Sequence, residues 1–152
     1  MVKIIAVGTL KRGFPLHNEG LSDGTYLGQY RTRERLPMVV AGPWYAPMVL
    51  DQPGNGLQIR GELYETSEAS LSRLDDLESV GQPGNTRTVV EVEPIGSGHA
   101  CRAILYVKSP ELASPIHSGC LEDYQDRRFI PPNMRSASPS RSAQAPWVEV
   151  RR

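Results

Sequence analysis

Two kinds of short run recur along most of the chain. In some, apolar and polar residues alternate with the period of two that is typical of β-strands with one buried face, and others, such as residues 3–7, 37–40 and 48–51, are short apolar or β-branched runs. Clusters of glycine, proline and asparagine, such as Pro53-Gly54-Asn55-Gly56, separate the runs and favour turns. The pattern predicts strands over residues 3–7, 25–33, 37–40, 48–51, 58–65, 87–93 and 101–107. The short link 94–98 between the last two runs predicts a β-hairpin.

The pattern changes its period over residues 67–77. Leu71, Leu74 and Leu77 recur at every third position there, which favours a helix with one apolar face. Ser67 is placed to cap the first turn through its side-chain oxygen. We therefore expect a helix between two groups of strands.

A second short helix is predicted over residues 121–128, ended by Pro131-Pro132. Seven short strands with one or two helices indicate an α+β domain, and a curved sheet or small barrel would leave few exposed strand edges. We assign residues 1–132 to this domain. Residues 133–152 are rich in Ser, Pro and Arg and are expected to form a flexible tail, although residues 147–150 leave docking of that tail open.

Charge and composition exclude several classes of protein. The 152 residues carry 17 basic and 17 acidic side chains, a formal net charge of zero that argues against nucleic-acid or anionic-membrane partners. No apolar run approaches the roughly 18 residues of a membrane-spanning helix, and residues 1–8 lack the features of a secretory signal. Cys101 and Cys120 do not make a disulfide framework, so we expect free thiols and a cytoplasmic location. The three histidines are scattered, so no metal site is expected.

The first candidate site is the junction Val7–Gly13, where a strand runs into a glycine-containing turn. Gly8 would let a ligand approach the backbone closely, and successive N–H groups in such a turn can hold a carboxylate or carbonyl oxygen. The G-x-x-x-x-G-K-[ST] pattern of a phosphate-binding loop is absent. Taken alone, the junction fits an ordinary strand-ending turn better than a binding site.

The second candidate site is the acidic run Asp75-Asp76-Leu77-Glu78 at the C-terminal end of the predicted helix. The helix dipole is negative at this end, and Asp75 lies one turn before Glu78. Both effects disfavour ionisation and should raise the pKa of a carboxyl, as burial would. A more basic carboxylate is a better general base, but a solvated acidic helix end is the commoner meaning of such a pattern.

Aromatic residues offer a third, weaker group of candidates. Trp44 and Tyr45 lie in a loop flanked by Gly and Pro, where they would either wall a pocket or pack against the core. Tyr106 lies on a predicted strand, so we expect it in the core with its hydroxyl at a surface or pocket rim. Residues 123–128 are assigned no chemistry.

Together the first two candidates resemble the motifs of one known family. Val7-Gly8-Thr9-Leu10-Lys11-Arg12-Gly13 is similar to the Y-G-T-L-K-x-G signature of the gamma-glutamyl cyclotransferase-like superfamily, and most of all to its gamma-glutamylamine branch. Leu74–Glu78 resembles the L-D-x-[LF]-E motif of that family, and Arg87 matches an arginine that follows it. The resemblance covers residues 2–132. It implies a small mixed β-barrel with one or two flanking helices.

The resemblance also implies a reaction and its residues. Val7, Gly8, Thr9 and Leu10 would bind the gamma-glutamyl group of a small-molecule substrate through their backbone. Glu78 would act as general base and then general acid while the substrate α-amine attacks its own γ-carbonyl. The products would be 5-oxoproline and a free amine, as in a lyase or transferase reaction that needs no cofactor and no metal.

Two departures from the family pattern keep an alternative open. Val7 stands where the signature has tyrosine, and the span 81–86 lacks the usual tyrosine between the glutamate and the arginine. The alternative is a non-catalytic member of the fold that binds a small carboxylate or a protein. The sequence predicts neither the leaving amine nor the oligomeric state.

Overall fold

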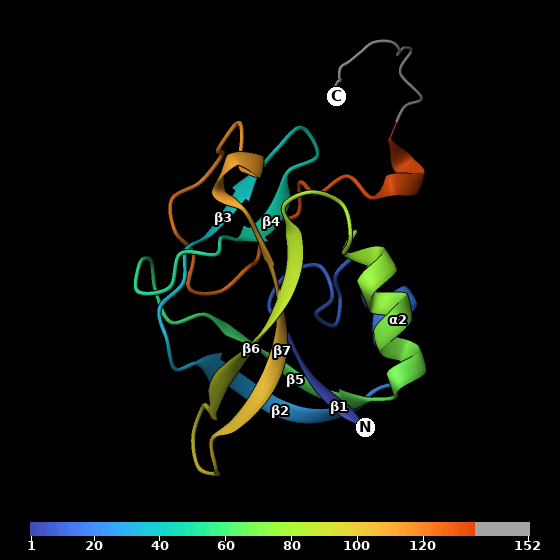
Figure 1. Cartoon of the computed structure of the whole chain (residues 1–152), viewed down its shortest axis with the longest axis vertical. Helices are drawn as coiled ribbons and strands as arrows, with labels where there is room; N and C mark the ends of the chain where they lie inside the picture. The colour runs from blue at the N-terminus through green and yellow to red at the C-terminus, as the bar shows by residue number, and fades with distance from the viewer. Residues whose placement is uncertain (136–152) are drawn as a thin grey trace.

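The predicted strands and the first predicted helix are all present in the computed structural model, which describes residues 1–135 (Figure 1). The strands are β1 (Val2–Ala6), β2 (Thr25–Thr32), β3 (Met38–Ala41), β4 (Ala46–Val49), β5 (Arg60–Thr66), β6 (Asn85–Pro94) and β7 (Cys101–Lys108). The helices are α1 (His17–Gly20) and α2 (Glu68–Leu77), with single 3-10 turns at Pro110–Leu112 and Pro132–Met134. The α+β class is confirmed.

Five strands close into a barrel in the order β1-β5-β2-β6-β7. Strand β1 is antiparallel to β5, with Ile5 opposite Leu63, and parallel to β7, where Ile4 pairs with Ile104. Strands β6 and β7 form the predicted antiparallel hairpin, while β3 and β4 pair in a separate two-stranded sheet. The expected small mixed barrel is therefore confirmed, and its closure leaves the five strands without an open edge.

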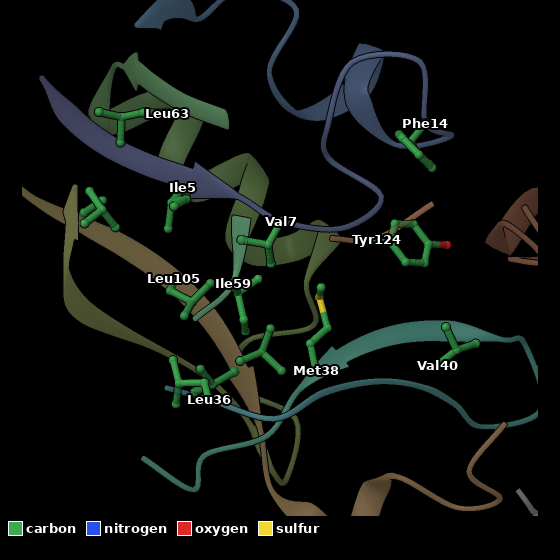
Figure 2. Close-up of a cluster of buried hydrophobic side chains, with 14 residues drawn as sticks. Ile5, Val7, Phe14, Leu36, Met38, Val40, Ile59, Leu63, Leu105 and Tyr124 are labelled. Atoms are coloured by element: carbon green, nitrogen blue, oxygen red, sulfur yellow. The ribbon is translucent and has the colours of Figure 1, made fainter. Parts of the chain in front are cut away.

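The barrel interior is filled by the buried side of each alternating strand. In β7, Ala103, Leu105 and Val107 are buried, whereas the residues between them are partly exposed. Figure 2 shows Leu105 near Ile5 of β1, within the same apolar cluster as Leu63 of β5. Burying a large aliphatic side chain of this kind stabilises the fold by about 1.5–3 kcal/mol.

Helix α2 packs against the outside of the barrel (Figure 1). Its residues Leu71 and Leu74 are buried in a second apolar cluster with Ile4 of β1 and Tyr64 of β5. The Oγ atom of Ser67 accepts a backbone N–H of the first turn at 3.1 Å, so the predicted N-cap is confirmed. The cap and the leucine face together fix where the C-terminal end of the helix lies.

The predicted helix over residues 121–128 is wrong, because this segment has no regular secondary structure and bends at residues 122 and 123. Its backbone bonds across to strands: the N–H of Leu121 donates to the carbonyl of Met38 at 2.8 Å, and the carbonyl of Glu122 accepts from the N–H of Arg60 at 2.8 Å. Backbone groups engaged in this way cannot join a helical i→i−4 ladder. The segment instead covers the barrel on its way to the C-terminal residues.

Lys11 ties this irregular segment to the turn that follows β1. Its side chain is only 6% exposed, and its ammonium donates to Asp123 Oδ1 at 2.9 Å and to the carbonyl of Tyr124 at 2.8 Å. Burial acts to raise the pKa of Asp123, but hydrogen bonds from Lys11 and Gln125 bring it below its usual value. The pair therefore stabilises the fold above the ordinary pKa of an aspartate, and the contribution is lost as the pH falls below it.

Replacing Lys11 by methionine is expected to destabilise the protein by about 1.5–3 kcal/mol, the usual range for a hydrogen bond to a charged group. The reason is that the carboxylate of Asp123 and a buried carbonyl lose their donor. The shift of the urea unfolding midpoint at neutral pH measures the effect. Lys3→Met is the control, because Lys3 makes no ion pair within residues 1–135. Equal midpoints for the two variants would contradict the anchoring role.

Only the beginning of the expected tail falls within the described residues. After the 3-10 turn Pro132–Met134, the Nε atom of Arg135 donates to the carbonyl of Ile130 at 2.9 Å. The remaining residues 136–152, including Trp147, lie outside the described part of the chain. Within residues 1–135, no helix is long and apolar enough to cross a membrane.

Candidate functional site

A hollow of about 520 Å³, counting its open mouth, brings the two candidate regions of the sequence together. We call it the first hollow. The turn after β1, the end of α2 and the end of β7 contribute to its walls. It is lined by Ile5, Val7, Gly8, Thr9, Leu10, Met38, Pro47, Val49, Glu78, Thr86, Leu105, Tyr106, Val107 and Lys108. All five residues predicted for the site therefore border one space.

The glycine in the turn after β1 allows a close approach between two walls of this hollow. A Cβ atom built on Gly8 would lie 2.7 Å from Cγ of Pro47, a separation that real side chains do not tolerate. The turn itself is closed by the N–H of Lys11, which donates to the carbonyl of Gly8 at 3.0 Å. The lack of a side chain at Gly8 thus lets the turn pack closely against Pro47 of β4, and Gly8 itself lines the hollow.

Glu78 follows the last residue of α2, and its N–H donates to the carbonyl of Leu74 at 2.9 Å. Ser79 adopts a left-handed conformation with φ of 59°, which ends the helix and turns the chain away. Part of the Glu78 residue reaches solvent, but burial of its carboxyl raises its pKa above the ordinary value of 4.5. The positive charge of Lys108 opposes part of that rise.

Burial, rather than a neighbouring aspartate, is thus the main cause of the raised pKa of Glu78. The carboxylate of Asp75 points to other partners: it accepts from Arg87 at 3.0 Å and from the hydroxyl of Tyr106 at 2.8 Å. Burial and the hydrogen bond to Asp75 both raise the pKa of Tyr106. The sequence correctly predicted that the pKa of Glu78 is raised. The expectation that the charge of Asp75 contributes to the rise is not supported, because Arg87 balances that charge.

Lys108 is a charged residue of the hollow that the sequence analysis did not single out. It lies at the end of β7, partly buried, and its ammonium donates to the side-chain oxygen of Asn85. Burial lowers the pKa of Lys108, and the charge of Glu78 opposes that change. A lysine that ends an otherwise alternating apolar strand was the available signal, but the same pattern also describes an exposed strand end.

A second hollow of about 670 Å³, again counting its open mouth, adjoins the first and shares Thr9, Pro47, Glu78 and Lys108 with it. Its remaining walls come from the ends of α1 and α2, from β4 and from the C-terminal segment. They are Leu16, Ala46, Met48, Leu77, Ser79, Phe129, Pro132 and Arg135. Figure 1 shows the turn Pro132–Met134 at the end of the molecule to which α2 and β4 also extend. Glu78 therefore stands at the boundary between two spaces.

The aromatic candidates have different surroundings from those expected of pocket walls. Tyr45 stacks on His117, with ring centroids 4.1 Å apart, and Trp44 lies under the guanidinium of Arg135. Neither lines the first hollow, whereas Tyr106 does, with its hydroxyl turned to Asp75. Within residues 1–135 there is no group of three or more His, Cys, Asp or Glu side chains arranged to hold a metal ion.

Comparison with known proteins places this geometry in a family. The family model for gamma-glutamyl cyclotransferase, AIG2-like proteins matches residues 4–125. The chain belongs to this family. The matched range runs from Ile4 within β1 to beyond β7 and contains every residue that lines the first hollow.

Individual members of the gamma-glutamyl cyclotransferase, AIG2-like family support the same placement. The gamma-glutamylaminecyclotransferase of Rattus norvegicus is 36% identical over 117 residues, which cover 70% of this chain and 77% of the rat protein. The crystal structure of an AIG2-like protein from Mus musculus superposes with a TM-score of 0.76 at 31% identity, covering 89% of this chain and 99% of the mouse chain. A relative from Arabidopsis thaliana is 40% identical over 84 residues, and the match spans 52% of this chain but only 44% of that protein.

Proposed function

We propose that the protein is a cyclotransferase that releases 5-oxoproline and a free amine from a gamma-glutamyl amine or related amide. The observation that carries this proposal is the meeting of Glu78 with the Val7–Leu10 turn in one hollow, although some seventy residues separate them in sequence. The names of the rat relative and of the family agree with such a reaction. We assign the activity to the domain of residues 1–132. Because both cysteines are free thiols, we also propose a cytoplasmic location for the protein.

In the proposed reaction, backbone groups of the turn hold the gamma-glutamyl group and Glu78 accepts one proton from its α-ammonium. The freed amine attacks the γ-carbonyl carbon, so a C–N bond closes the five-membered ring. As the original amide C–N bond breaks, protonated Glu78 gives its proton to the leaving nitrogen. The second proton released by the attacking nitrogen ends on the departing amine, which leaves as an ammonium ion.

So few side chains suffice because both reacting groups belong to the same molecule. Holding the substrate in the rotamer that brings amine and carbonyl together replaces a bimolecular encounter, which is worth several kcal/mol of activation free energy. Backbone N–H groups near the γ-carbonyl would stabilise the charge that develops on its oxygen. The buried setting raises the basicity of Glu78, which suits proton removal from an ammonium.

The proposal is tested by assaying 5-oxoproline formation from a panel of gamma-glutamyl amides and gamma-glutamyl amino acids. We expect turnover of at least one class. A second candidate function, binding of a small carboxylate without chemistry, is favoured by the presence of Val7 in place of the tyrosine of the family signature. If calorimetry detects binding of gamma-glutamyl compounds but no 5-oxoproline forms from any of them, the binder is the correct assignment.

Removing the charge of Lys108 is expected to change the pH dependence of the reaction. The general base must be ionised, so kcat/KM rises as the pH increases through the pKa of Glu78, which lies above 4.5. Lys108 lowers that pKa, and Lys108→Met should therefore move the acidic limb of the profile to higher pH. Profiles of kcat/KM for this variant, for Lys3→Met and for the unmodified protein measure the shift. A limb that stays in place, or moves to lower pH, would show that Lys108 does not act on the base.

A further inference from the structure

Arg135 has an unusual position for an arginine near the end of the described chain. It is partly buried and lines the second hollow, which also contains Glu78. It lies ten residues beyond the range matched by the family model, residues 4–125, so that match says nothing about its role. The surroundings of its guanidinium therefore have to explain what it does.

Two aromatic rings and a backbone carbonyl lie against this guanidinium. The ring of Trp44 lies 4.8 Å from the guanidinium carbon and the ring of Phe129 lies 5.7 Å from it. The Nε atom donates to the carbonyl of Ile130 at 2.9 Å, and the N–H of Ile130 in turn donates to the carbonyl of Trp44 at 2.9 Å. Aromatic contacts and a backbone acceptor thus fix the plane of the side chain.

The two terminal nitrogens of Arg135 have no partner in the part of the chain that the structure describes. Among residues 1–135, neither Nη1 nor Nη2 donates a hydrogen bond to a protein atom, and no carboxylate of that part of the chain lies within ion-pair distance. Burial lowers the pKa of this guanidinium, as expected for a cation that has lost water and gains no counter-ion from residues 1–135. A fixed fork with two free donors matches the geometry of a carboxylate.

The other charges of the second hollow decide what sign of ligand it accepts. Lys108 contributes a second positive charge, and Glu78, the proposed base, is the one acid among the residues that line the space. The rest of the lining is mainly apolar and includes Leu16, Met48 and Phe129. A ligand with an apolar chain and an anionic end would be complementary to these walls. An ammonium at the end of the amine portion would find no free carboxylate among the described residues that line the space.

We propose that Arg135 binds an anionic group on the leaving amine, so that the enzyme prefers gamma-glutamyl amides whose amine portion ends in a carboxylate. The inference rests on the proposed function. If the gamma-glutamyl group occupies the first hollow, its γ-amide reaches Glu78 at the boundary, and the amine portion extends into the second hollow toward Arg135. Arg135 is then a specificity-determining residue that takes no part in bond making.

Three amides of matched length test this assignment: the gamma-glutamyl amides of 4-aminobutanoate, butylamine and 1,4-diaminobutane, which end in a negative, a neutral and a positive group. We expect the unmodified protein to have the highest kcat/KM for the first and the lowest for the third. In Arg135→Gln, kcat/KM for the anionic amide should fall roughly 10- to 100-fold, the equivalent of losing a hydrogen-bonded charge pair, while that for butylamine changes less than about threefold. Arg135→Glu should reverse the order of the two charged amides.

Arg135→Lys separates recognition from packing, because it keeps the charge but loses the planar fork. It should recover only part of the preference for the anionic amide, at a melting temperature close to that of the unmodified protein. If kcat/KM falls by the same factor for all three amides in every Arg135 variant, Arg135 supports the structure of the site but does not recognise the leaving group. The inference is then wrong. If the unmodified protein forms no 5-oxoproline from any amide, the proposed function itself fails.

Discussion

Replacing Glu78 by glutamine is expected to lower turnover about 10²- to 10⁴-fold, the usual contribution of a general base. The substitution keeps the size of the side chain and removes its ability to accept a proton. Activity should therefore fall while binding of a gamma-glutamyl compound persists. Single-turnover formation of 5-oxoproline, with binding measured separately by calorimetry, distinguishes the two effects.

The stability of Glu78→Gln helps to distinguish loss of the general base from loss of folding. Because burial raises the pKa of Glu78 in the folded protein, the folded state binds its proton more tightly than the unfolded chain does. Ionisation of Glu78 therefore costs stability as the pH rises above 4.5, and Glu78→Gln should be at least as stable as the unmodified protein at neutral pH. Asp76→Asn, an exposed acid two positions earlier, is the control and should change neither activity nor stability. Unchanged turnover in Glu78→Gln would remove this residue from the mechanism.

Replacing Gly61 by valine is expected to cost about 3 kcal/mol of unfolding free energy, at the upper end of the usual cost of overpacking. A Cβ atom at Gly61 would lie 2.6 Å from the carbonyl oxygen of Ala6 and 2.8 Å from Cγ1 of Val7. The first neighbour is backbone, so the end of β1 would have to move away from β5. The turn that forms one wall of the first hollow begins at that point.

We therefore expect Gly61→Val to lower the melting temperature by on the order of 10 °C and to reduce activity below the transition as well. Gly119→Val is the matched control, because a Cβ atom there has no neighbour within 4 Å and Gly119 is exposed. Thermal unfolding followed by circular dichroism compares the two. If Gly61→Val has the same melting temperature as Gly119→Val, then β1 and β5 can move apart without a loss of stability.

The local elements could be predicted from the sequence because local patterns determine them. Alternating runs, together with short apolar or β-branched runs such as residues 3–7 and 37–40, placed all seven strands, and the leucine spacing with Ser67 placed α2. The helix α1 was missed since its four residues are too few to show a period. Residues 121–128 were assigned to a helix because a polar run next to prolines does not reveal that its backbone will bond to Met38 and Arg60.

The candidate site was only partly predictable, for a related reason. The resemblance to family motifs brought Glu78 and the turn after β1 to attention, but no local pattern shows that they share a hollow. The role of Asp75 depends on Arg87 and Tyr106, which reach it from β6 and β7. Lys108 and Arg135 were not predicted as site residues, because the role of a single basic residue depends on neighbours that are distant in sequence.

The parallel pairing of β1 with β7 has a consequence for how the protein is made. Ile4 meets Ile104, so the barrel closes only after the chain has been synthesised beyond β7. At roughly 5–20 residues per second on the ribosome, β1 waits several seconds for its last partner, with its apolar face available to chaperones. Contacts between residues so distant in sequence also slow folding. Nascent chains that end before β7 should accordingly lack the first hollow, even when α2 has already left the exit tunnel.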